Sequence, residues 1–66
     1  MNEEESILGH LFKQLEVEKE EITNALSHGT ARDYAEYRSL AGRIQGLATA
    51  QSFITATVDR LRKQLE

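Results

Sequence analysis

Two histidines, His10 and His28, are the first candidates for metal binding or acid–base chemistry in this 66-residue sequence. A metal site on a helix needs a second ligand three or four positions away, and neither histidine has a carboxylate or another histidine at that spacing. The chain has no cysteine, which excludes disulfides and thiolate sites. It also has no phosphate-binding glycine loop and no nucleophile motif. We therefore expect no metal, no cofactor and no catalytic residue, so the protein is not predicted to be an enzyme.

A row of small residues in the second half of the chain is a stronger candidate for a binding surface. Gly42, Gly46 and Ala50 recur at intervals of four, although glycine inside a helix costs about 1 kcal/mol relative to alanine. Small side chains let two helix backbones approach closely. We predict a second helix-packing face here, and the alternative is a solvent-facing surface that happens to be small.

Charge is distributed unevenly along the sequence. Residues 1–26 hold seven acids and two bases, net −5, while residues 27–66 hold four acids and six bases, net +2, which together give −3. An acidic chain is poorly suited to coating nucleic acid, and no apolar run approaches the ~20 residues of a membrane span. We expect a soluble protein in the cytoplasm.

Helix is the expected conformation almost throughout, because the chain lacks proline and is rich in helix-forming residues. The one clear break is at Gly29, which can end a helix in the left-handed conformation. We predict one domain over residues 1–66, with a first helix over about 3–26, a turn over about 27–30 and a second helix over about 31–64. Thr30 with Asp33 can form a capping box for the second helix, and Asp33 with Glu36 is the rival cap.

Apolar residues recur at spacings of three and four along both predicted helices, which is typical of helices that pack side by side. On the first helix the predicted seam is Leu8, Leu11, Leu15, Ile22 and Ala25, with Glu18 in one core position and Ile7, Phe12 and Leu26 widening it. On the second helix the predicted seam is Tyr37, Leu40, Ile44, Leu47, Gln51, Ile54, Val58, Leu61 and Leu65. A short turn makes two such helices antiparallel.

Gln51 and the two tyrosines of the chain each have two interpretations. A lone polar residue at a core position often fixes the register of a helix pair, but Gln51 could also reach water near the end of the first helix. Tyr34 and Tyr37 begin the second helix, where their rings are expected to cover the turn end against Ile22 and Leu26; the alternative is ligand stacking, which no other residue supports.

The predicted turn also sets the register of the hairpin. With the turn centred near Gly29, Leu15 lies beside Gly42 and Met1 beside Ala56. The second helix then outruns the first by about ten residues, or ~15 Å. This extension would carry three uncovered apolar residues of the seam: Val58, Leu61 and Leu65. Covering a large apolar side chain contributes about 1.5–3 kcal/mol, so we predict that another chain packs there; a frayed end is the alternative.

The segment 33–47, DYAEYRSLAGRIQGL, resembles a pattern in short two-helix proteins encoded by tailed bacteriophages. In that pattern, D-Y-x-x-Y-R-x-L-x-G-x-I-x-G-L follows a glycine-containing turn and an acidic first helix. These proteins have no assigned activity, so the resemblance implies a phage context, as a virion or assembly component, and no catalytic residue. It also implies that the working surface consists of Tyr34, Tyr37, Arg38, Gly42 and Gly46.

The sequence thus predicts an all-α antiparallel hairpin with a longer second helix, assembled into a helical bundle by oligomerisation or by docking on a partner. The predicted function is a non-enzymatic, phage-encoded protein–protein interaction module in the bacterial host cytoplasm or the virion. Its partner would be a second copy or a larger phage or host protein. The predicted interface consists of Tyr34, Tyr37, Arg38, Gly42, Gly46, Ala50, Val58, Leu61 and Leu65.

Two alternative functions stay open. A dimeric RNA-binding regulator, similar in size and topology to Rop-type four-helix bundles, would require Arg38, Arg43 and Arg60 to line one face of the dimer. An acidic inhibitor of a host protein would use the run of glutamates on the first helix, which comprises Glu16, Glu18, Glu20 and Glu21.

Overall fold

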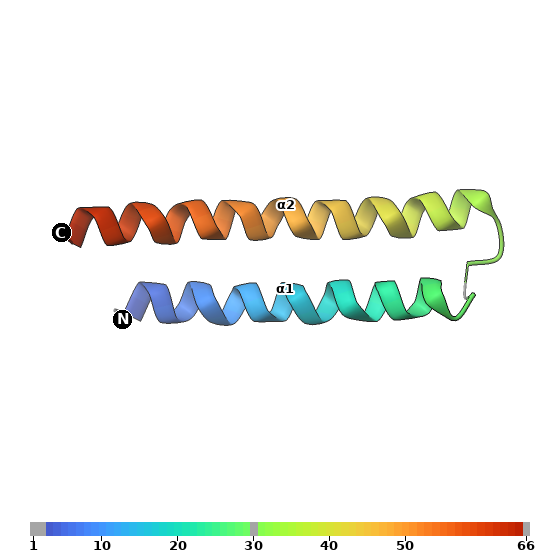
Figure 1. Cartoon of the computed structure of the whole chain (residues 1–66), viewed down its shortest axis with the longest axis horizontal. Coiled ribbons are helices and arrows are strands. Elements are labelled where there is room, and N and C mark those ends of the chain that lie inside the picture. The colour runs from blue at the N-terminus through green and yellow to red at the C-terminus, as the bar shows by residue number, and fades with distance from the viewer. Residues whose placement is uncertain (1–2, 30, 66) are drawn as a thin grey trace.

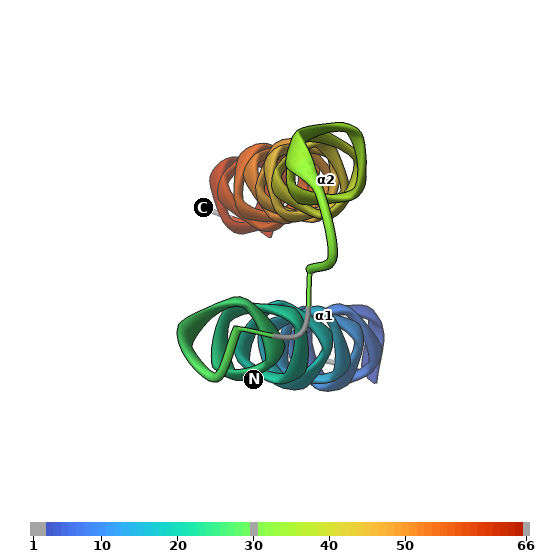
Figure 2. The same ribbon diagram turned by 90° about the vertical axis from the view of Figure 1, so that its right-hand side faces the viewer.

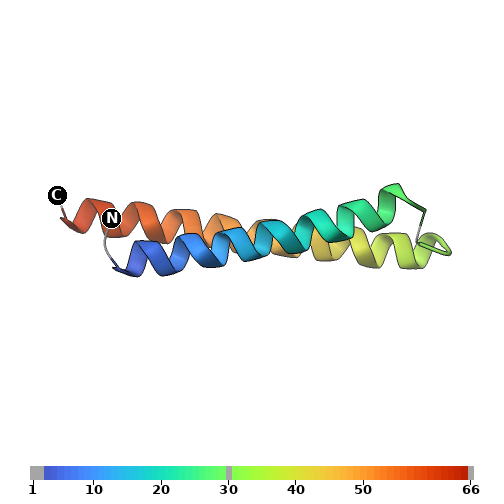
Figure 3. The ribbon, with the colours of Figure 1, turned by 90° about the horizontal axis from the view of Figure 1, so that it is seen from below.

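The computed structural model describes residues 3–29 and 31–65 as two antiparallel helices (Figure 1). Helix α1 spans Glu3–Ser27 and helix α2 spans Tyr34–Leu65, and the part of the chain so described contains no strand. The hairpin measures 50 × 15 × 11 Å along its principal axes. Its helices lie side by side and cross at a shallow angle (Figures 2 and 3). The prediction of an all-helical hairpin with a longer second helix is confirmed.

Helix α1 begins and ends with the chemistry that the sequence predicts. Three glutamates occupy its first turn, where the positive end of the helix dipole favours negative charge. At the other end, Gly29 adopts a positive φ of 70° and donates its backbone N–H to the carbonyl of Leu26 at 3.1 Å. His28 donates from Nδ1 to the carbonyl oxygen of Asn24 at 2.7 Å, and the same oxygen accepts the backbone N–H of His28 at 3.1 Å.

The start of α2 uses the second of the two predicted caps. The carboxylate of Asp33 accepts a hydrogen bond from the backbone N–H of Glu36 at 2.8 Å, and Glu36 in turn accepts from the N–H of Arg32 at 3.4 Å. The predicted cap at Thr30 lies outside the described residues. Because Asp33 is the cap, the helix begins at Tyr34 rather than near residue 31, and the connection between the helices is longer than predicted.

The register of the hairpin differs from the predicted one. Arg62 donates from Nε to Oε1 of Glu5 at 2.9 Å, whereas the predicted register would have placed Glu5 beside Ser52, ten positions earlier (62 against 52). The predicted ten-residue extension is therefore wrong, because Val58 and Leu61 are half-buried within the hairpin. Helix α2 has 32 residues against 25 in α1, and it extends past α1 at both ends (Figure 1).

The two helices bury one heptad row each, which we call the contact row. On α2 it runs as predicted from Leu40, through Ile44, Leu47, Gln51, Ile54 and Val58, to Leu61. On α1 it consists of Glu5, Leu8, Phe12, Leu15, Lys19, Ile22 and Leu26. Among the described residues, Ile22 is the one apolar side chain that is buried, at 6% exposure.

Two predicted seam residues of α1, Leu11 and Glu18, are exposed. Phe12 and Lys19 take their places, one position later in each case. On the same side of α1, Glu5 pairs with Arg62, and the carbonyl of Phe12 accepts a hydrogen bond from Gln51.

Neither helix, over its described residues, has an apolar stretch of the length and hydropathy that crossing a membrane requires.

Candidate interaction surfaces

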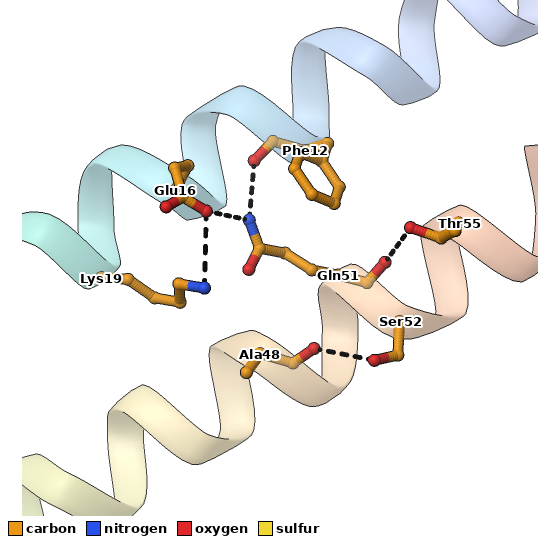
Figure 4. Close-up of polar contacts among 7 residues, drawn as sticks. All are labelled: Phe12, Glu16, Lys19, Ala48, Gln51, Ser52 and Thr55. Carbon is orange, nitrogen blue, oxygen red and sulfur yellow. Dashed lines mark hydrogen bonds and ion pairs between the residues drawn. The ribbon is translucent and has the colours of Figure 1, made fainter.

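Gln51 is the centre of a polar cluster that joins the two helices. Its side chain is buried at 5% exposure, and its Nε2 donates to the carbonyl oxygen of Phe12 at 3.3 Å and to Oε2 of Glu16 at 2.8 Å (Figure 4). The ammonium of Lys19 lies 3.4 Å from the same carboxylate oxygen. Gln51 therefore does not reach bulk water, and a role in fixing the register stays a prediction.

The cluster holds Glu16 in its ionised form. The hydrogen bond from Gln51 is the main reason that the pKa of the Glu16 carboxyl lies below its ordinary value, and burial acts in the opposite direction. The hydrogen bond and the positive charge of Lys19 lower the pKa further. At neutral pH, Glu16 is a carboxylate that accepts hydrogen bonds from both sides of the interhelical contact.

A second polar contact closes the end of the hairpin that holds the chain termini. Glu5 is 7% exposed although it is charged, and Arg62, whose side chain is 61% exposed, reaches over from α2 to contact it at 2.9 Å. A carboxylate this deeply buried needs charged or polar partners. The pair thus ties the first turns of α1 to the last turns of α2.

Two grooves run between the helices on one side of the hairpin, which we call the polar side. The groove nearer the chain ends, about 250 Å³, is lined by Gly9, Phe12, Ile54, Thr55, Val58, Asp59 and Arg62. The other, about 470 Å³, is lined by Phe12, Lys19, Ala48, Gln51, Ser52, Thr55, Ala56 and Asp59. Both linings mix apolar side chains with charged and hydroxyl ones, and Lys19, Asp59 and Arg62 place charges along this side.

A hollow of about 600 Å³ on α1 includes His10 but has no opposing wall. Its lining consists of His10, Lys13, Gln14, Leu15, Val17 and Glu18, all from one helix. A ligand pocket normally surrounds most of its ligand, which a single helix cannot do. In the described residues, no group of three or more His, Cys, Asp or Glu side chains is placed to hold a metal ion.

Tyr34 and Tyr37 lie at the turn end, in the first turn of α2. Their rings stack on each other with centroids 6.5 Å apart and planes 16° apart. They are 72% and 50% exposed, so they cover little of the turn end, contrary to the expectation that they would pack against Ile22 and Leu26. The reason is the register, which leaves this first turn of α2 beyond the end of α1.

Arg38, Gly42 and Gly46 are exposed on the outer face of α2. A Cβ atom added at either glycine would meet nothing within 4 Å. The hairpin itself therefore gives no packing reason for these two glycines.

Phe53 lies on the same outer face and is 69% exposed, although it is not among the predicted interface residues. Phe53 follows Gly46 by seven positions, or two helical turns. Residues seven positions apart lie on the same face of a helix, so the sequence spacing could have predicted that Phe53 lies beside the two glycines. We call this row the small-residue face, and it consists of Gly42, Gly46, Thr49, Phe53 and Ala56.

The predicted interface residues do not form one surface. Arg38, Gly42 and Gly46 share the outer face, whereas Val58 and Leu61 belong to the contact row and Ala50 is half-buried beside it. The side chain of Leu65 lies outside the described residues. Arg38 and Arg60 point in similar directions from α2, but Arg43 is five positions from Arg38, or about 140° around the helix.

Comparison of the chain with protein-family models, with curated proteins and with solved structures gave no match.

Proposed function

We propose that the chain is a non-enzymatic protein–protein interaction module that binds a helix of a larger protein, in the virion or the assembly of a bacteriophage. The observation that carries the proposal is the small-residue face. Its two glycines cost about 1 kcal/mol each relative to alanine, and nothing in the hairpin lies within 4 Å of where their Cβ atoms would be.

Phe53 supports the same proposal because it is a large apolar side chain on the small-residue face. Large aromatic side chains are typical anchors of protein interfaces, and this one is 69% exposed in a chain that has only two phenylalanines. A helix that lies along Gly42 and Gly46 would come close enough to the α2 backbone for its side chains to pack around the Phe53 ring. The glycines would set the distance and the aromatic ring would supply apolar contact.

The phage context comes from the resemblance of residues 33–47, and the surface fits it in part. Three residues of that pattern, Arg38, Gly42 and Gly46, lie on the outer face of α2. The two tyrosines of the pattern are exposed at the turn end of the same helix. A partner that extends from the turn along the outer face would contact both groups.

The test is affinity capture from phage-producing cells with three forms of the chain. The wild type should retain a specific partner protein, and the double variant Gly42→Leu/Gly46→Leu should lose it, because two leucines keep the partner backbone away. Gly9→Leu is the matched control, since Gly9 is also a helical glycine at which an added Cβ atom would meet nothing within 4 Å, but it lies on α1.

Circular dichroism should show equal helix content in all three forms. Equal capture by the wild type and the double variant would refute the role of the small-residue face. Capture of structured RNA in a salt-dependent manner would instead favour the regulator alternative.

A further inference from the structure

The two sides of the hairpin differ in their exposed large apolar side chains, none of which lines a groove on the polar side. On α1, Gly9 follows the contact-row residue Leu8 and lines the polar side, so Ile7, one position before Leu8, lies on the opposite side. On α2, Ser52 follows Gln51 and lines the polar side, so Ala50 lies opposite by the same argument. The side away from the two grooves can therefore be assigned from the helix period.

This opposite side carries an apolar patch, which we call the apolar flank, together with the exposed charges of Glu4, Glu18 and Arg43, which the same helix period places there. The flank consists of Ile7, Leu11, Leu47, Ala50 and Leu61. Ile7 and Leu11 are 55% and 43% exposed, and the other three are half-buried. Leu47 and Leu61 are contact-row residues that line neither groove.

We infer that a second copy of the chain packs on the apolar flank, so that two hairpins form a four-helix bundle. The inference concerns a different surface from the small-residue face and goes beyond the proposed function. In this bundle the polar sides of both hairpins face water, and Glu16, Lys19 and Arg62 stay hydrated while the flanks meet.

The surface area of the single hairpin matches what such a dimer needs. The chain exposes 5188 Å², whereas a compact folded protein of 7.5 kDa exposes about 4,200 Å². The surplus is about 1,000 Å², and a standard stable interface buries about 800 Å² on each partner. One interface with a second hairpin therefore brings the exposed surface to the value usual for this mass.

The charge distribution selects one arrangement of the two copies. The first 26 residues carry a net charge of −5 (seven acids, two bases) and the remaining residues carry +2 (six bases, four acids). Packing α1 of one copy beside α2 of the other brings opposite charges together, whereas α1 beside α1 brings like charges together. A twofold axis parallel to the helices gives the favoured arrangement and brings the two flanks face to face. Thr57, which is half-buried one heptad after Ala50, lies at the edge of the flank, so Leu11 of one copy would lie near Thr57 of the other.

Sedimentation equilibrium of the full chain tests the dimer through a matched pair of variants. Ile7→Glu puts a charge on the flank, while Val17→Glu puts the same charge on the outer face of α1, two positions from both Leu15 and Lys19 of the contact row. The two wild-type side chains are equally exposed, at 55% and 53%. We expect a mass of 15 kDa, twice 7.5 kDa, for the wild type and Val17→Glu, and at least a tenfold weaker dimer for Ile7→Glu.

A wild-type mass of 7.5 kDa at high micromolar concentration would overturn the inference, and so would equal masses for the two variants. Neither result bears on capture of a partner by the small-residue face, so the two proposals fail separately. A disulfide test addresses the arrangement, because the chain has no cysteine of its own. Oxidation of mixed Leu11→Cys and Thr57→Cys chains should give mainly the mixed dimer, and a predominance of Leu11→Cys pairs would overturn the arrangement.

Discussion

Single residues in this hairpin account for features that apolar patterning does not explain. Gln51 and Glu5 are the most deeply buried polar side chains of the described residues, at 5% and 7% exposure. Both make hydrogen bonds across the interhelical contact, to Glu16 and from Arg62 respectively. A polar group buried with partners adds little net stability but penalises every register in which those partners are missing. We therefore expect these two residues to specify the register of the hairpin.

The pH dependence of stability should report the contact between Gln51 and Glu16. The pKa of Glu16 is lowered in the folded chain from its ordinary value of 4.5, first of all by Gln51. A lowered pKa stabilises the fold at pH values above the ordinary pKa, and that contribution is lost as the pH falls through the folded-state pKa. In Gln51→Leu, the pKa of Glu16 should rise, and the loss of stability on acidification should be smaller than in the wild type.

The measurement is a carboxyl-detected NMR titration of Glu16, together with urea unfolding at several acidic pH values. Lys19→Met is the comparison, because Lys19 also lowers the pKa of Glu16 but ranks behind Gln51 among the causes. A larger rise of the pKa in Lys19→Met than in Gln51→Leu would contradict the assigned order.

At the scale of the helices, the existence of both elements could be predicted, but their relative placement could not. Helix-forming residues and the glycine stop at Gly29 act locally, so they are readable from the sequence. The start of α2 depended on which of two overlapping caps forms, and the Asp33 cap moves that start by three residues. The register could not be predicted, because it depends on the path of the connection and on contacts between the helices, such as those of Glu5 with Arg62 and of Phe12 with Gln51.

The binding surfaces were predictable to a similar extent. The spacing of Gly42 and Gly46 placed them on an outer face, and both are exposed there. Leu11 was assigned to the seam because it continues the apolar heptad pattern. The apolar face of α1 is wider than its contact row, and Leu11 lies outside that row. Ile7 and Leu11 lie at the edge of this apolar face and belong to the flank. The sequence alone does not distinguish them from the residues that contact α2.

The cap of α2 gives a prediction at this scale. Asp33→Ala removes the carboxylate that accepts the backbone N–H of Glu36 at 2.8 Å, and such a loss typically costs about 1 kcal/mol. Urea unfolding followed by circular dichroism should show a lower free energy of unfolding. Thr30→Ala is the comparison, because Thr30 is the rival cap in the sequence; a greater loss in this variant than in Asp33→Ala would show that the helix starts elsewhere.

The whole molecule is a long, thin unit with little interior of its own. Two helices can cover each other along one row, and here Ile22 is the one buried apolar side chain among the described residues. Chains of this size usually need a disulfide, a metal or association with another chain to be stable. The chain has no cysteine, and we propose that association with other helices supplies this stability through the flank and the small-residue face.

The central claim is that the hairpin is completed by other helices, and thermal unfolding at different concentrations tests it most directly. If folding is coupled to association, the midpoint of unfolding must rise with protein concentration, because mass action favours the associated state. We predict a midpoint that rises by several degrees between low and high micromolar chain. A cooperative transition whose midpoint is the same across that range, from a particle of 7.5 kDa, would contradict the claim.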